Sequence, residues 1–110
     1  MQIDEERKGQ TVILKIIGRL DSTNSSELDI TISNLVSQNE KVILVNCQNL
    51  DYVSSAGLRV FLKGLKSVNA IQGKFLICSL KDSIKEIFDI SGFTGIFTLY
   101  GSQDEALSAI

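Results

Sequence analysis

The sequence predicts an α/β fold: a small mixed β-sheet that begins with an N-terminal hairpin and has about four helices packed against it. Short apolar runs recur along the chain, and segments with apolar residues at helical spacing alternate with them. Two strands followed by a helix and then repeated strand-helix units are typical of layered α/β proteins. With 110 residues, 44% of them hydrophobic, the chain can bury one core, so a single domain over residues 1–110 is expected.

The N-terminal hairpin is predicted from alternation. Residues 2–6 and 10–17 have the pattern of two strands, and the polar residues 7–9 lie between them as a turn. From Val12 to Ile16 every second residue is aliphatic, which indicates a strand with one buried face.

A first helix and a central strand follow the hairpin. The polar run at residues 22–26 offers several N-cap residues, and apolar residues then recur at helical spacing as far as Gln38. Residues 41–46 hold a continuous β-branched and aliphatic run, which is typical of a strand covered on both faces.

The second half of the chain continues the alternation. A helix from Ser55 has one apolar stripe, residues 74–78 form a further strand, and residues 81–90 form a helix. Residues 96–100 have the pattern of a last strand, and residues 102–105 form a capping-box pattern that opens a short final helix.

Composition narrows the function classes. The chain has no histidine, so it holds no Ser-His-Asp or Cys-His arrangement, and it shows no phosphate-binding glycine loop, metal-ligand cluster or dinucleotide fingerprint. No enzyme activity, cofactor or metal is therefore expected. A net charge of −2 with scattered lysines argues against nucleic-acid binding and favours protein partners.

Two further observations concern cell compartment and cysteine chemistry. No apolar stretch approaches the roughly 20 residues that span a bilayer, so the chain is not expected to insert into a membrane. The acidic N-terminus differs from a signal peptide, and a cytoplasmic location is therefore expected. Cys47 and Cys78 follow apolar runs, which predicts buried free thiols and no disulfide or metal pair.

The most informative segment is residues 51–59, where two adjacent serines stand at the predicted start of the second helix. A helix N-terminus has N–H groups without intrahelical partners and carries the positive end of the helix dipole, so it suits a capping hydroxyl or a phosphate. Local spacing alone favours capping, and the same serine is able to serve both roles. Gly57 keeps this turn free of bulk.

Other polar residues have structural interpretations from spacing alone. Asp21, Ser22 and Thr23 are expected to turn the chain and cap the first helix. Leu58 is expected in the core, and Arg59 is expected to be a solvated helix charge.

The order of elements, together with four segments, resembles the STAS domain and, within it, the bacterial anti-sigma-factor antagonists. The segments are residues 18–21, 54–58, 73–78 and 87–93. The resemblance covers essentially the whole chain. It implies a partner-switching protein that, when unphosphorylated, binds an anti-sigma factor that is also a serine kinase. Phosphorylation by that kinase ends the binding, and a serine phosphatase restores the active form.

The resemblance also implies site residues. The family's phospho-acceptor stands two positions before the motif glycine, which is Ser55 here, with Ser54 as the second choice. Many antagonists have Asp directly before the acceptor, where this chain has Ser54. The implied partner-binding residues are Asp21, Ser22, Thr23, Ser54, Ser55, Gly57, Leu58 and Arg59.

Rival functions remain open at this point. A STAS subunit of a membrane transporter that docks on its ATPase would share the same fold. An enzyme would need a pocket of carboxylates or lysines with perturbed pKa values. Nucleotide binding would need a site, and no nucleotide-binding motif is present in the sequence.

Overall fold

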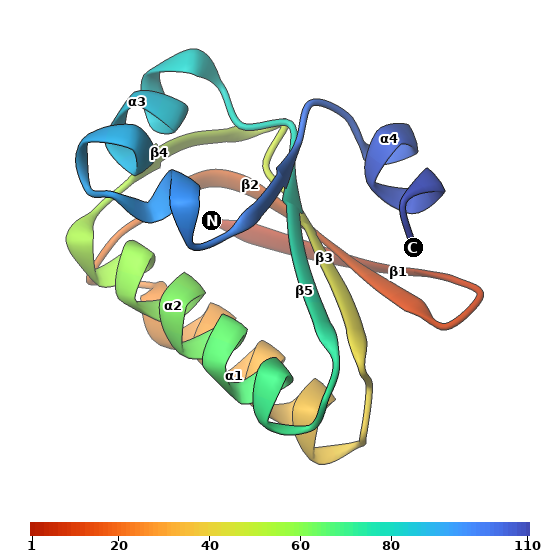
Figure 1. Cartoon of the computed structure of the whole chain (residues 1–110). Coiled ribbons are helices and arrows are strands. Elements are labelled where there is room, and N and C mark those ends of the chain that lie inside the picture. Colours follow the sequence, from red (N-terminus) through yellow and green to blue (C-terminus); the bar gives the residue numbers. More distant parts are fainter.

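The computed structural model describes all 110 residues and confirms the α/β fold class, with a mixed six-stranded sheet and four α-helices (Figure 1). The strands are β1 (Gln2–Lys8), β2 (Thr11–Leu20), β3 (Val42–Asn46), β4 (Leu50–Val53), β5 (Lys74–Cys78) and β6 (Thr98–Tyr100). The helices are α1 (Ser25–Ser37), α2 (Ser55–Ala70), α3 (Asp82–Ile90) and α4 (Gln103–Ser108), with a short 3-10 helix, η1 (Phe93–Gly95).

The hairpin at the N-terminal end is tighter than the sequence predicts. Arg7 and Lys8, expected in the turn, belong to β1, and Lys8 pairs with Thr11. Gly9, at a φ of +60°, forms with Gln10 a two-residue connection. Such short connections need a positive φ and let both strands run further toward the turn.

The sheet has the strand order β1-β2-β3-β5-β6, and β4 pairs with β2 beside this path. Only the β1–β2 hairpin is antiparallel, and every other pair of strands is parallel. The parallel connections are made by helices, as the alternation of strand and helix predicts.

Strand β4 lies between the strand predicted at residues 41–46 and the helix predicted from Ser55, where the sequence pattern predicts no element. Strand β2 extends past Ile17 to Leu20, and its last three residues pair with β4, with a register shift between Gly18 and Arg19. Gly18 has a φ of +98°, and its N–H donates to the carbonyl of Asn49 at 2.9 Å. Strands β3 and β4 thus lie end to end along one side of β2. The pairing of β2 with β4 joins distant segments, so no local sequence pattern predicts it.

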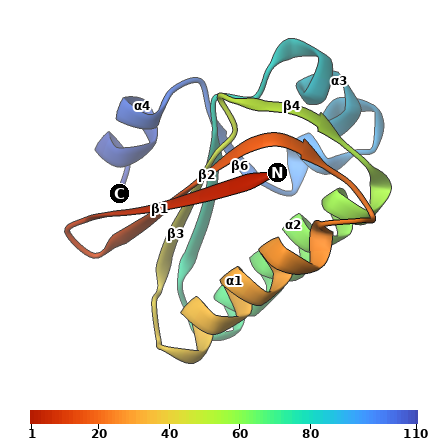
Figure 2. The same cartoon turned by 180° about the vertical axis from the view of Figure 1, so that it is seen from behind.

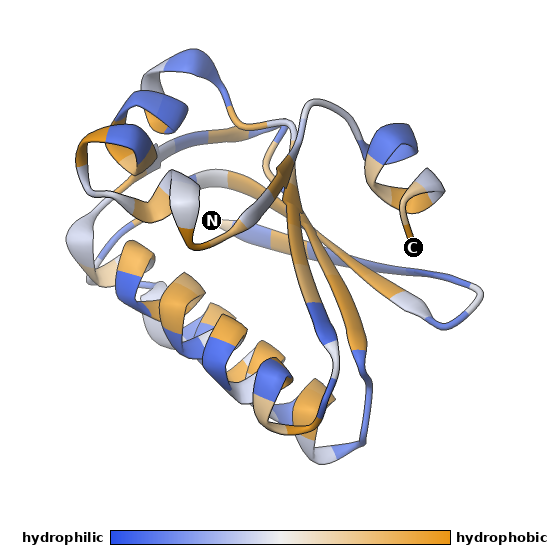
Figure 3. Ribbon diagram, in the orientation of Figure 1, coloured by the Kyte–Doolittle hydropathy of each residue, from blue (hydrophilic) through white to orange (hydrophobic).

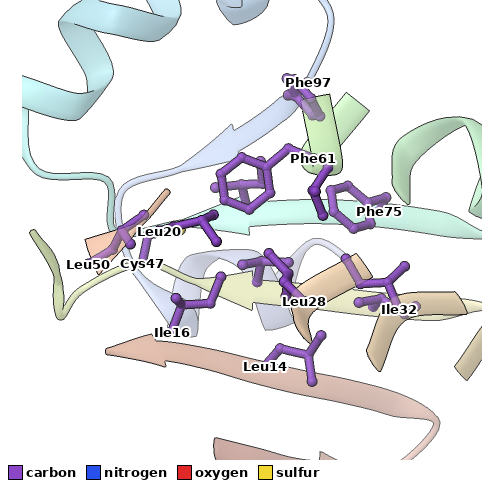
Figure 4. Packing of buried hydrophobic residues seen from close by; sticks show 14 of the residues in the cluster. Leu14, Ile16, Leu20, Leu28, Ile32, Cys47, Leu50, Phe61, Phe75 and Phe97 are labelled. Carbon is purple, nitrogen blue, oxygen red and sulfur yellow. The ribbon is translucent and has the colours of Figure 1, made fainter. Parts of the chain in front are cut away.

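Helices cover the sheet unequally. Helices α1, α2 and α3 pack on one face, and α4 lies alone on the other, as the two opposite views show (Figures 1 and 2). The main core lies under the first three helices, where Leu28 and Ile32 of α1 and Phe61 of α2 meet alternate residues of β2 (Figure 4). The orange strands at the centre of Figure 3 show how apolar this layer is.

The smaller core under α4 combines apolar packing with one buried amide. Ala106 packs against Leu44 and Leu76. Asn46 is 5% exposed; its Nδ2 donates to Oε1 of Gln103 at 2.8 Å and its Oδ1 accepts from the Gln48 N–H at 2.9 Å. Both polar atoms of the amide thus have a hydrogen-bond partner, as burial of a polar group requires.

A cluster of phenylalanines joins α2, α3 and η1. Phe88 of α3 is fully buried, and its ring centroid lies 6.0 Å from Phe61, 6.1 Å from Phe93 and 5.7 Å from Phe97. These separations and tilted or edge-on angles are the favoured arrangements of aromatic pairs. Phe88 therefore anchors α3 to the rest of the main core.

The two cysteines are free and buried, as the sequence predicts. Cys47 belongs to the core under α2 and Cys78 to the core under α4. Burial raises the pKa of both thiols, so neither carries thiolate character at neutral pH. None of the helices has the length and apolarity that a bilayer crossing demands.

Candidate functional site

Parallel pairing of β2 and β4 brings two distant segments to one edge of the sheet. Leu20 at the end of β2 is the register partner of Val53 at the end of β4, and the Ser54 N–H donates to the Leu20 carbonyl at 2.9 Å. The loop of residues 21–24 therefore leaves the sheet beside the start of α2. These two segments form the candidate site.

The two serines differ in their contacts at the start of α2, and the expected capping by a serine falls to Ser54. Ser54 is the N-cap of α2, with an extended backbone, and its Oγ accepts from the Gly57 N–H at 3.4 Å. Ser55 is the first residue of the helix and is exposed. The hydroxyl of Ser54 is thus half-buried and engaged, whereas that of Ser55 is open to solvent and bonds to no protein group.

The electrostatic setting of α2 differs from that of the other helices. The first turns of α1, α3 and α4 contain acidic residues: Glu27, Asp82, and Asp104 with Glu105. The first turn of α2 contains none. Because an anion at a helix N-terminus is stabilising, an added negative charge at Ser55 would meet a favourable field.

The loop before α1 is held by its own hydrogen bonds. Oδ1 of Asp21 accepts from the Thr23 N–H at 2.9 Å and from the Thr23 hydroxyl at 2.6 Å. The Asn24 side chain accepts from the Asp21 N–H at 3.0 Å and donates to the Arg19 carbonyl at 2.9 Å. Ser22 is exposed at the tip of the loop.

The expected capping of α1 by Asp21, Ser22 or Thr23 is wrong. The N-cap is Asn24, and no side chain caps the helix. The reason is that Asn24 uses its amide to close the loop behind it, while Asp21 bonds to Thr23. The three residues do turn the chain, as expected.

Replacing Asp21 by asparagine should remove a stabilising effect that depends on pH. The Thr23 hydroxyl, followed by the Thr23 N–H, donates to the carboxylate and lowers the pKa of Asp21. A carboxyl with a lowered pKa in the folded state stabilises it above the unfolded pKa, and that contribution is lost as pH falls. The melting temperature of wild type should therefore exceed that of Asp21→Asn at pH 7, and the two should converge in acid. An equal difference at both pH values would contradict this role.

Two of the implied partner-binding residues lie inside the fold. Gly57 is buried, and a Cβ there would stand 2.7 Å from Cγ2 of Val53 and 2.8 Å from Cγ of Leu20. Leu58 is 8% exposed and belongs to the main core. The burial of Leu58 confirms its expected place in the core, and contact of either residue with a partner stays a prediction. Arg59 is exposed and forms no ion pair.

Gly57→Ala should destabilise the fold, although alanine is the better helix former. Overpacking destabilises a fold by about 1–3 kcal/mol. The higher helix propensity of alanine offsets at most about 1 kcal/mol of this loss. We expect a net loss of about 1–2 kcal/mol in the free energy of unfolding, measured by urea denaturation. Gly95→Ala is the matched control, because no atom lies within 4 Å of a Cβ there. A Gly57→Ala protein as stable as wild type would show that Leu20 and Val53 move aside freely.

The structure adds an aromatic residue and a cation that the sequence did not single out. Tyr52 is 38% exposed, and the guanidinium carbon of Arg19, its register partner, lies 4.2 Å from the ring centroid. The sequence offers only one signal for this pair, an aromatic residue two positions before the serine pair. The pairing with Arg19 depends on β4, which was itself missed.

The largest cavity lies elsewhere. It measures about 500 Å³ and is lined mostly by polar residues that follow β3, β5 and β6, among them Gln48, Ser79 and Gln103. No group of three or more acidic or cysteine side chains is placed to hold a metal ion. The candidate site is therefore a surface and not a pocket.

Comparison with known proteins identifies relatives over the whole chain. The sequence profile of the STAS domain matches residues 2–106. BtrV of Bordetella bronchiseptica, a candidate anti-sigma factor antagonist by name, is 33% identical over 109 residues, which cover 99% of this chain and 94% of BtrV.

Solved structures share the fold at lower identity. A candidate anti-sigma factor antagonist from Thermotoga maritima superposes with a TM-score of 0.94 at 17% identity, covering 98% of this chain and 93% of the other. The Bacillus cell fate determinant SpoIIAA, in its phosphorylated form, gives a TM-score of 0.79 at 21% identity, covering 98% of both chains. At these identities the likeness establishes the fold alone.

Proposed function

Since the chain belongs to the STAS domain family, among the anti-sigma factor antagonists, we propose that it binds an anti-sigma factor and thereby releases a sigma factor. This family is non-enzymatic, and its members act by binding. In the full proposal the anti-sigma factor is also a serine kinase, it binds the unphosphorylated chain, and it ends the binding by phosphorylating Ser55. A serine phosphatase reverses the step. The proposal places the chain in the cytoplasm, where sigma factors act.

The observation that carries the proposal is the exposed, unbonded hydroxyl of Ser55 at the start of α2. A kinase needs such a hydroxyl, and the Ser54 hydroxyl is half-buried and bonded to the Gly57 N–H. Ser54 is therefore the second choice as acceptor. The departure from the Asp that many antagonists carry at this position leaves the cap neutral, so no carboxylate competes with a phosphate for the helix N-terminus.

A phosphate at Ser55 should change the surface without unfolding the domain. It adds about −1.5 to −2 charges and three acceptor oxygens. The helix start favours the anion, and Arg59, four residues on along the same helix face, carries a free cation. In the complex the partner would cover a charged phosphate instead of a neutral hydroxyl. The phosphate should therefore lower the affinity for the partner and not the stability of the fold.

The test is a pull-down from an extract of the native organism with three baits: wild type, Ser55→Asp and Ser83→Asp. Ser83 is also an exposed serine in the first turn of a helix, α3, so it controls for the added charge. We expect wild type and Ser83→Asp to hold a kinase-type anti-sigma factor that Ser55→Asp loses. Transporter subunits held equally by all three baits would favour the transporter function instead.

A second measurement assigns the modified serine. The recovered kinase is incubated with ATP and the wild-type chain, and the modified residue is located by mass spectrometry of its peptides. Phosphate on Ser55 is expected. Phosphate on Ser54 alone would overturn the assignment while leaving partner switching intact.

A further inference from the structure

Arg19 and Tyr52 form a cation–π pair near the ends of β2 and β4, the two strands that precede the candidate site. They are register partners on β2 and β4, both are exposed, and the guanidinium lies over the tyrosine ring at 4.2 Å from its centroid. A stacked guanidinium uses its face and keeps its N–H donors, which lie in its plane, available. The ring thus holds Arg19 in place without occupying its hydrogen-bond donors.

Arg19 forms no ion pair with a carboxylate of this chain, although its charge contributes to lowering the pKa of Asp21. The five ion pairs use other cations: Arg7, Lys15, Lys63, Lys81 and Lys85. The nearest carboxylate along the chain, Asp21, accepts instead from the backbone and hydroxyl of Thr23. In a chain with a net charge of −2, Arg19 is therefore an exposed cation that lies over the Tyr52 ring and forms no ion pair.

The pair is next in register to Leu20 and Val53, at the end of the sheet where α2 begins, and its side chains lie on the opposite face of the sheet from those two core residues. Arg19 precedes Asp21 by two residues and Tyr52 precedes Ser54 by two residues, and the next register pair, Leu20 with Val53, joins both segments. A partner that covers Ser55 and the loop of residues 21–24 reaches this edge, since an ordinary protein interface buries about 800 Å² on each side.

We propose that Arg19, held over Tyr52, binds an aspartate or glutamate side chain of the anti-sigma factor at the rim of the interface around Ser55, an inference that rests on the proposed function. Arg pairs with a carboxylate through two parallel N–H bonds, and tyrosine and arginine are enriched among residues that dominate interfaces. A phosphate on Ser55 would repel the same carboxylate, which would add to the loss of affinity expected on phosphorylation.

The experiment measures the affinity of the purified anti-sigma factor, recovered with the wild-type bait, for four variants by titration calorimetry. Arg19→Glu reverses the charge, Arg19→Lys keeps the charge but loses the planar donors, and Tyr52→Leu removes the ring. Lys8→Glu is the control, because Lys8 is exposed, forms no ion pair and ends β1 at the hairpin turn, where it pairs with Thr11 at the opposite end of β2 from Arg19. Thermal melts confirm that each variant is folded.

The expected result is an affinity loss of at least about tenfold for Arg19→Glu and smaller losses for Arg19→Lys and Tyr52→Leu, with Lys8→Glu within about twofold of wild type. The wild-type affinity should fall with added salt more steeply than that of Arg19→Glu, whereas Arg19→Lys, which keeps the charge, should follow wild type. If Arg19→Glu binds like wild type, the carboxylate contact is overturned and the proposed function stands. If wild type itself binds no anti-sigma factor, both are overturned.

Discussion

Ser55→Asp is expected to weaken binding of the anti-sigma factor at least about a hundredfold, which corresponds to about 2.7 kcal/mol. The substitution places a fixed charge on a residue that is exposed and at the centre of the candidate site. Binding would have to remove that charge from water or set it against the partner's own carboxylates, and either costs free energy. Titration calorimetry with the purified partner measures the effect.

Two controls separate charge from loss of the hydroxyl. Ser55→Ala should bind the partner within a few fold of wild type, because it removes the acceptor without adding charge. Ser83→Asp should bind like wild type, because it adds the same charge at the first turn of α3, outside the two segments that form the candidate site. An unchanged affinity for Ser55→Asp would mean that Ser55 is not the control point.

The same substitution should leave the fold cooperative and slightly more stable. Helix α2 has no acidic residue in its first turn, so an aspartate at Ser55 adds about 0.3–1 kcal/mol of favourable interaction with the helix dipole. Ser83→Asp should add less, because Asp82 already occupies the first turn of α3. Loss of binding together with a raised melting temperature would exclude unfolding as its cause.

Phe88→Ala is expected to produce the largest loss of stability, about 3–5 kcal/mol in the free energy of unfolding. Phe88 is fully buried, and its ring packs against Phe61, Phe93 and Phe97. Its removal leaves a cavity where α3 meets α2 and the segment before β6. Because domains are usually stable by only about 5–15 kcal/mol, this variant approaches the limit of folding.

Urea denaturation followed by circular dichroism measures this loss. Ile90→Ala, on the same helix but 84% exposed, should change stability by less than about 0.5 kcal/mol. Phe88→Leu should lie between the two, because it retains most of the apolar volume. If Phe88→Ala unfolds at the urea concentration of wild type, the aromatic cluster does not hold α3 in place.

Much of the fold could be predicted because local patterns decide it. The strand at residues 74–78 is found where its aliphatic run predicts, and the helix from Ser55 begins where its apolar stripe and serine cap indicate. Ser102 caps α4 through the Glu105 N–H, as the capping-box pattern predicts. These features depend on residues within four positions of one another, so they can be seen in one sequence.

The missed features depend on contacts between distant segments. Strand β4 forms because it pairs with the end of β2. Gly57 is buried because Leu20, the last residue of β2, packs close to it. The Asn24 amide turns away from α1 because the Arg19 carbonyl and the Asp21 N–H lie within reach. In each case a local preference for loop, surface or cap was overridden by a tertiary partner.

The sequence by itself determined the α/β class, the order of nearly all its strands and helices, and the presence of a serine pair at a helix start, because hydrophobic period and capping are local properties. Only the tertiary structure decided which serine caps and which stays free, and which implied contact residues are buried. It also brought Arg19 onto Tyr52 beside the loop of residues 21–24. The physical reason is that side-chain exposure depends on what packs against it, and parallel pairing joins segments some thirty residues apart, such as Leu20 and Val53.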